Sequence, residues 1–112
     1  MNASSRKAAQ LLRDRTRTQR AAQRIHRNGT ASLATHVIAQ GLGPKAAASV
    51  AGTLRKKTRE LGLTGTTARV HAGRRMRTTT RFTPRQVALA AALYRPRIAA
   101  YKTVAARLAL AA

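Results

Sequence analysis

The sequence predicts a mainly α-helical fold with one small β-hairpin, and three observations support this prediction. Apolar residues recur at helical spacing over residues 44–61, which indicates an amphipathic helix. Over residues 75–82 the pattern becomes a strict alternation, which is typical of a β-strand. Glycine and proline separate these segments, with Gly41, Gly62 and Pro84 at the expected helix boundaries.

Composition points to a polyanionic partner. The 112 residues include 23 lysines and arginines but only two acidic residues, so the formal net charge is +21 at pH 7. Such a charge repels itself in a compact body, and a polyanion would relieve the repulsion. A GC-rich genome would explain much of the preference for arginine over lysine, but not the near absence of acidic residues. We therefore expect a nucleic-acid partner.

The hydrophobic core is expected to be thin, because much of the apolar content is alanine and the aromatic residues are two tyrosines and one phenylalanine. We therefore expect marginal stability without a ligand or a second copy of the chain. The sequence has no cysteine, which excludes disulfides and agrees with a cytoplasmic location. No stretch approaches the ~20 apolar residues of a membrane span.

Residues 1–20 are expected to form a basic N-terminal arm or helix. One alternative is a long helix anchored at both ends, by Leu11 and Leu12 and then by Ala22 and Ile25. The other is an arm followed by a short helix from about Ala21. We favour the long helix, because the segment is rich in good helix formers. Its cations would contact phosphates without reading base sequence: Arg13, Arg15, Arg17, Arg20, Arg24 and Arg27.

Two helices are expected next, joined by a glycine corner. Thr30 or Ser32 would cap a short helix that buries Leu33, Val37 and Ile38 and ends at Gly41. Pro44 then begins the clearest helix in the sequence. Its buried stripe would be Ala47, Val50, Ala51, Leu54, Thr58 and Leu61. The opposite face would present Lys45, Ser49, Thr53 and Lys56, flanked by Arg55, Lys57 and Arg59.

A basic hairpin is expected after this helix. Residues 66–71 are β-prone with Val70 inward, and residues 71–74 would close the turn. The alternation predicts an inward side of Met76, Thr78, Thr80 and Phe82, and an outward side of Arg75, Arg77, Thr79 and Arg81. The hairpin arginines would be Arg69, Arg74, Arg75, Arg77 and Arg81. The alternative is a disordered basic loop that binds any polyanion.

The remaining residues predict a C-terminal helical pair. Residues 83–86 read as a capping box with proline at the first helical position. The first helix would bury Val87, Ala90, Ala91 and Tyr94. The second would begin at Pro96 and carry Ile98, Tyr101, Val104, Ala105 and Leu108. These helices would close the core or pair with a second copy to form a homodimer. The tyrosines are interpreted as packing residues.

The order of helix, short helix, glycine corner, amphipathic helix and basic hairpin resembles the winged helix-turn-helix class of DNA-binding proteins. The resemblance covers residues 21–83, followed by the C-terminal helices over residues 84–112. It implies that helix 44–61 lies in the major groove and reads bases with Lys45, Ser49, Thr53 and Lys56. The hairpin arginines, together with Arg55, Lys57 and Arg59, would then contact the DNA backbone.

Catalysis is not expected. Asp14 and Glu60 are the only carboxylates, and both lie among basic residues as expected salt-bridge partners, whereas acid–base pairs or a Mg²⁺ site need more. His26, His36 and His71 lack the spacing of metal ligands, so a surface or half-buried role is expected for each. We therefore expect no enzyme activity and no catalytic, cofactor or metal site.

The leading hypothesis is a double-stranded DNA-binding protein, associated with the nucleoid, that regulates transcription or shapes DNA for a mobile element such as a phage or plasmid. The alternative is a structural RNA-binding protein of the ribosome-associated kind, although single-stranded RNA readers usually expose aromatic rings. A membrane-active cationic protein is disfavoured, because the basic residues are spread over every segment instead of one polar face.

Overall fold

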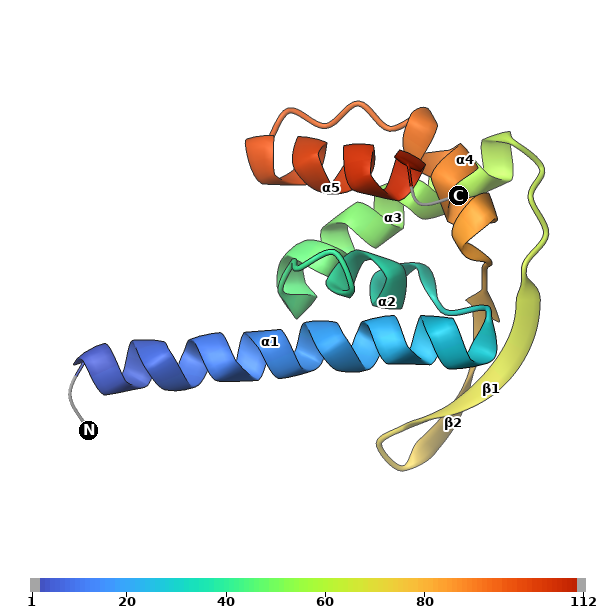
Figure 1. Cartoon of the computed structure of the whole chain (residues 1–112). Helices are drawn as coiled ribbons and strands as arrows, with labels where there is room; N and C mark the ends of the chain where they lie inside the picture. The colour runs from blue at the N-terminus through green and yellow to red at the C-terminus, as the bar shows by residue number, and fades with distance from the viewer. Residues whose placement is uncertain (1–2, 111–112) are drawn as a thin grey trace.

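Five helices and a β-hairpin make up the part of the chain that the computed structural model describes, residues 3–110 (Figure 1). The mainly helical fold with one two-stranded antiparallel sheet confirms the predicted fold class at this level. The elements, in chain order, are α1 (Ala3–Asn28), α2 (Leu33–Ile38), α3 (Pro44–Glu60), β1 (Thr66–Ala72), β2 (Arg75–Arg81), α4 (Pro84–Ala92) and α5 (Ala99–Leu110).

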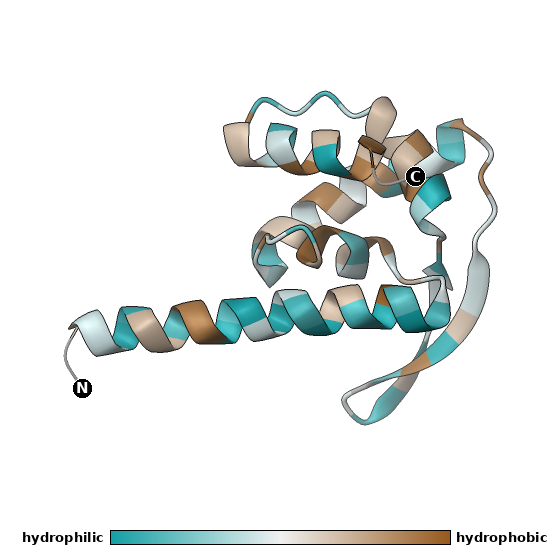
Figure 2. Ribbon diagram, viewed as in Figure 1, coloured by the Kyte–Doolittle hydropathy of each residue, from teal (hydrophilic) through white to brown (hydrophobic). Residues whose placement is uncertain are grey.

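A single core lies where α2, α3, α4 and α5 meet. Figure 2 shows apolar residues gathered between these helices, whereas α1 is mostly hydrophilic. Leu54, Val37, Val50 and Val87 are the largest fully buried side chains, and alanines fill much of the remaining contact. Both C-terminal helices contribute to this core, because Val104, Ala105 and Leu108 of α5 belong to the same cluster as the α3 stripe. Pairing with a second copy stays a prediction.

The helix starts follow the predicted capping chemistry. Ser32 caps α2, and its hydroxyl accepts a hydrogen bond from the Thr35 backbone N–H at 3.3 Å. Thr83 and Gln86 form the predicted capping box of α4, with distances of 3.2 Å and 2.9 Å for its two hydrogen bonds. The Gln86 amide nitrogen also donates to the Thr64 carbonyl at 2.9 Å, so this cap ties α4 to the segment before β1.

α3 has the predicted buried stripe except at its end. Ala47, Val50, Ala51, Leu54 and Thr58 are buried, but Leu61 is 42% exposed. The prediction for Leu61 is wrong because the helix already ends at Glu60, and Gly62 then turns the chain away with φ of +67°.

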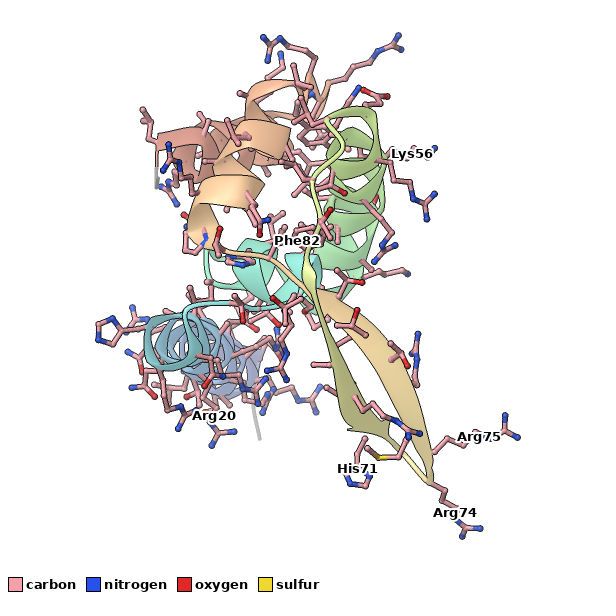
Figure 3. The ribbon with its side chains drawn as sticks, turned by 90° about the vertical axis from the view of Figure 1, so that its right-hand side faces the viewer. Arg20, Lys56, His71, Arg74, Arg75 and Phe82 are labelled. Carbon is pink, nitrogen blue, oxygen red and sulfur yellow. The ribbon has the colours of Figure 1, made fainter. Side chains whose placement is uncertain are left out.

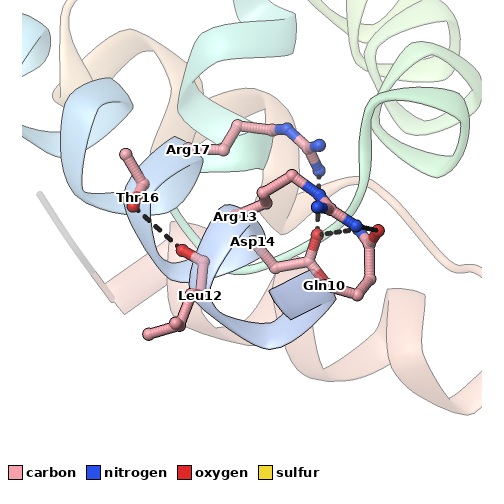
Figure 4. Close-up of polar contacts among 6 residues, drawn as sticks. All are labelled: Gln10, Leu12, Arg13, Asp14, Thr16 and Arg17. Carbon is pink, nitrogen blue, oxygen red and sulfur yellow. Dashed lines mark hydrogen bonds and ion pairs between the residues drawn. The ribbon is translucent and has the colours of Figure 1, made fainter. Parts of the chain in front are cut away.

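α1 is one continuous helix, so the alternative of an arm with a short helix from about Ala21 is wrong. The expected anchor at its N-terminal end is also wrong, because Leu11 and Leu12 are 58% and 63% exposed. Ala21 is the buried residue of this helix. Polar side chains of α1 form hydrogen bonds with one another (Figure 4). Asp14 accepts hydrogen bonds from Gln10 at 2.8 Å and from Arg17 at 3.3 Å.

Strand β2 has the predicted alternation but the opposite orientation, whereas Val70 of β1, predicted inward, is half-buried. Thr66 pairs with Arg81 and Ala72 with Arg75, as expected for two antiparallel strands. The predicted inward side is exposed, with Met76 at 43%, because the hairpin projects beyond the helical body (Figure 1). Thr79 and Arg81, predicted outward, are half-buried where the ribbon passes the end of α1. Only Phe82, just beyond β2, enters the core as predicted.

The root of the hairpin is joined to the segment between α1 and α2. The Ala31 N–H donates to the Phe82 carbonyl at 3.1 Å, and the Phe82 N–H donates to the Ala31 carbonyl at 2.8 Å. These two bonds form an antiparallel bridge between positions far apart in sequence. The bridge fixes the direction in which the hairpin leaves the body.

The last helix begins later than predicted, at Ala99 instead of Pro96. Ile98, expected in its buried stripe, therefore lies in the preceding segment and is 55% exposed. Tyr94 is buried and Tyr101 half-buried, as expected for packing residues.

Gly65 is expected to be essential for packing at the hairpin root. A Cβ at this position would lie 2.7 Å from the Arg81 carbonyl oxygen and 3.0 Å from Phe82 Cε1, so the backbone would have to move. We predict that Gly65→Ala lowers the free energy of unfolding by about 1–3 kcal/mol. The measurement is chemical denaturation. The control is Gly52→Ala in the α3 interior, where nothing lies within 4 Å; it should raise stability by about 0.5–1 kcal/mol. Equal effects would contradict the packing argument.

Candidate nucleic-acid interface

The exposed face of α3 carries three of the four predicted base-reading residues. Lys45, Ser49 and Lys56 are exposed and lie on one side of the helix. Thr53 is half-buried, and its side chain hydrogen-bonds Tyr94, which lies just after α4. Burial raises the pKa of Tyr94 above its ordinary value, and this hydrogen bond partly opposes the shift. Thr53 is therefore less available to a ligand than the other three, although it stands four positions after Ser49 on the same side of the helix.

Gly52 belongs to this face and was missed in the sequence. It stands seven positions after Lys45 and four before Lys56, which is the spacing of neighbours on one helical face. No atom lies within 4 Å of the position a Cβ would take. Because glycine has no side chain, the exposed face of α3 is locally low between Ser49 and Lys56. The spacing from Lys45 was the signal that could have identified it.

The flanking cations of α3 differ in availability. Arg55 and Arg59 are exposed, whereas Lys57 is half-buried and its Nζ lies 3.5 Å from Glu60 Oε2. Lys57 is therefore the least available of the three to an anionic ligand.

The hairpin presents its arginines on more than one side. Arg69, Arg74, Arg75 and Arg77 are exposed, and Arg81 is half-buried at the root. The register pairs Val70 with Arg77 and Thr66 with Arg81, so Arg75, Arg77 and Arg81 share one face of the ribbon. Arg69 lies on the other face, and Arg74 follows Gly73 in the turn.

The exposed cations of α3, the hairpin tip and α1 point in different directions. Figure 3 shows Lys56 on α3, Arg74 and Arg75 at the tip of the hairpin and Arg20 on α1. The predicted N-terminal cations all lie on α1: Arg13, Arg15, Arg20, Arg24 and Arg27 are exposed, and Arg17 is half-buried beside Asp14. In Figure 1 the hairpin tip extends past α1 and away from α3, so the exposed cations of α3, the hairpin and α1 are spread over several sides of the molecule.

Few cations are neutralised within the molecule. Asp14 pairs with Arg17 at 3.3 Å and Glu60 with Lys57 at 3.5 Å, which confirms both predicted salt-bridge roles. Both pairs are partly exposed to solvent and so contribute little to stability. Because the chain has only two acidic residues, nearly all of its positive charge remains available to an external anion.

His36 is buried, so the predicted surface or half-buried role is wrong for this histidine. It is 3% exposed, and its Nε2–H donates to the Phe82 carbonyl at 2.7 Å. Burial lowers the pKa of His36 below its ordinary value, although hydrogen bonds with the Phe82 and Ala31 backbone oppose the shift. His26 and His71 are exposed. Within residues 3–110, no three His, Asp or Glu side chains are grouped as metal ligands.

Comparisons of this chain with protein-family models, curated proteins and solved structures find no match. Among the described helices, none combines the length and apolarity needed to cross a membrane.

The burial of His36 predicts a pH-dependent stability. Its pKa is lower in the folded than in the unfolded chain, so below about pH 6.5 the unfolded chain takes up the proton first. We expect the free energy of unfolding to fall as pH decreases from about 6.5 to the lower folded pKa. Denaturation titrations at several pH values measure this. His36→Gln should remove this component, and the exposed-site control His71→Gln should retain it. A component that survives in His36→Gln would refute the assignment.

Proposed function

We propose that this chain binds double-stranded DNA as a winged helix-turn-helix protein, with α3 in the major groove and the hairpin as the wing. The order α1, bridge, α2, α3, β1 and β2 supports this proposal, because the Ala31–Phe82 pair adds a third strand position to the hairpin root. The observation that carries it is the net charge of +21 on a chain whose central helix and hairpin both expose cations, among them Lys56, Arg74 and Arg75 (Figure 3).

The dimensions of α3 suit base reading. The major groove is wide enough for one α-helix, and its donors and acceptors distinguish all four base pairs. From Lys45 to Lys56 the helix rises roughly 16 Å, which spans about five base pairs. Lys45 and Lys56 would donate to guanine edges, and Ser49 could pair with either base type. Gly52 allows the DNA to approach the helix closely between them.

The remaining cations would bind phosphates. Arg55 and Arg59 flank the α3 face that carries Lys45, Ser49 and Lys56, and Arg74 and Arg75 lie at the tip of the hairpin, beyond the helical body (Figure 3). The α1 arginines would add affinity without sequence preference. We propose that this binding occurs in the nucleoid, where the chain regulates transcription or shapes DNA for a mobile element.

Duplex DNA is favoured over single-stranded RNA by the placement of the aromatic rings. Phe82 and Tyr94 are buried and Tyr101 is half-buried. The exposed rings that remain are the imidazoles of His26 and His71, so no exposed Phe, Tyr or Trp ring offers a stacking platform of the kind common in single-strand recognition. Electrostatic contacts between basic side chains and the phosphates of a duplex need no such ring.

We expect duplex DNA to be selected over RNA. The test offers the immobilised chain random duplex DNA and random folded RNA at about physiological salt, roughly 0.15 M, with excess competitor. Enrichment of a short duplex motif supports the proposed reading helix, and a two-fold repeat would indicate a homodimer. Duplex retention without a motif would indicate an architectural protein. Preference for folded RNA would contradict the proposal and favour the ribonucleoprotein alternative.

Substitutions on α3 and on the hairpin should have separable effects. Lys56→Ala removes a proposed base contact, so it should cost about 1–3 kcal/mol on the preferred site and less on other duplexes. Arg77→Ala removes a phosphate contact, so it should weaken all duplexes alike and reduce the salt slope by about one. Thr53→Ala should change base preference less than Lys56→Ala, because Thr53 faces Tyr94. Equal loss on every sequence for Lys56→Ala would exclude α3 as the reader.

A further inference from the structure

A groove of about 360 Å³ lies between the C-terminal end of α1 and the root of the hairpin, apart from the proposed reading face. Its charged lining consists of Arg24 and Arg27 from α1 and Arg81 from β2. Thr30 and Thr79 add hydroxyl groups, and Asn28 adds an amide. Every charged group of this lining is a cation, and the neutral polar groups are short hydrogen-bonding side chains.

The three guanidinium groups are not neutralised inside the molecule. No acidic residue lines the groove, and the two that the chain possesses pair elsewhere, Asp14 with Arg17 and Glu60 with Lys57. Arg24 and Arg27 are also neighbours at helical i,i+3 spacing, where like charges repel each other. An anion in the groove would relieve this repulsion and accept hydrogen bonds from more than one arginine.

The walls of the groove are held in place before any ligand binds. The chain leaves α1 through Gly29, whose φ is +74°, and two residues later Ala31 pairs with Phe82. This pairing fixes the end of α1 beside the root of β2. Arg81 is half-buried there, so its side chain has less freedom to lose on binding than a fully exposed arginine.

We propose that this groove is a phosphate site that holds one backbone phosphate of a bound nucleic acid. The chemistry that selects this ligand is the guanidinium fork, which matches the oxygens of a phosphate group. The ribbon face that carries Arg81 also carries Arg77 and Arg75 toward the tip, so the groove begins a line of cations. Assignment of the phosphate to nucleic acid rests on the proposed function; binding of a phosphate anion does not.

The first arm of the test uses inorganic phosphate as the probe. The full chain is titrated at neutral pH while NMR follows the Nε–H groups of arginine and the amides of Thr30 and Thr79. We expect saturable shifts confined to the groove, and their loss in Arg24→Gln/Arg27→Gln. Both substituted residues are exposed on α1, so the fold should be retained, which a thermal melt verifies. Shifts spread evenly over all arginines would overturn the site.

The second arm tests the source of the phosphate with a duplex. Arg24→Gln/Arg27→Gln should weaken duplex binding about ten-fold and lower the salt slope by about one. The control Arg97→Gln/Arg107→Gln removes the same charge from exposed positions outside the groove and should weaken binding less than two-fold. Equal weakening by the two double variants would overturn the assignment to a backbone phosphate without contradicting duplex binding. If the unmodified chain binds no duplex, both the proposed function and this assignment are wrong. The titration with inorganic phosphate still tests whether the groove binds an anion.

Discussion

The backbone bridge between Ala31 and Phe82 is the constraint on which the rest of the structure depends. It holds the end of β2 against the segment that joins α1 to α2, although the two are separated by about half of the chain. The Phe82 carbonyl accepts from both the Ala31 N–H and the His36 ring, and the Phe82 side chain fills the core beneath. Because a buried carbonyl without partners is costly, this one position couples helix packing to hairpin direction.

The bridge matters more here because the core is small. The largest fully buried side chains are only a leucine and three valines, Leu54, Val37, Val50 and Val87, and alanine supplies much of the remaining buried surface. Alanine contacts bring helices close together but bury little apolar area per residue. The same chain carries a net charge of +21 that opposes compaction. The hydrogen bonds at the hairpin root and at the helix caps therefore supplement a small apolar core.

Local patterns predicted the elements well, and long-range contacts account for the differences. The capping box at Thr83 and the α3 stripe depend on residues within a few positions, so the sequence could identify them. The inward side of β2 could not be identified, because it depends on how the hairpin root lies beside the end of α1, which is distant in sequence. His36 was misplaced for the same reason, since its partner Phe82 is 46 positions away. Of the site, the sequence indicated the α3 face apart from Gly52, but it could not indicate the groove.

The projecting hairpin has a consequence for solubility. A two-stranded ribbon has two free edges, and each edge offers unpaired backbone groups to which a strand of another molecule could add. No helix or loop covers them along the outer part of the ribbon, where residues 73–78 are exposed. Arg69, Arg74, Arg75 and Arg77 surround this part, so two ribbons that approach edge to edge meet with strong like-charge repulsion. The charge of the hairpin therefore disfavours edge-to-edge pairing of two ribbons.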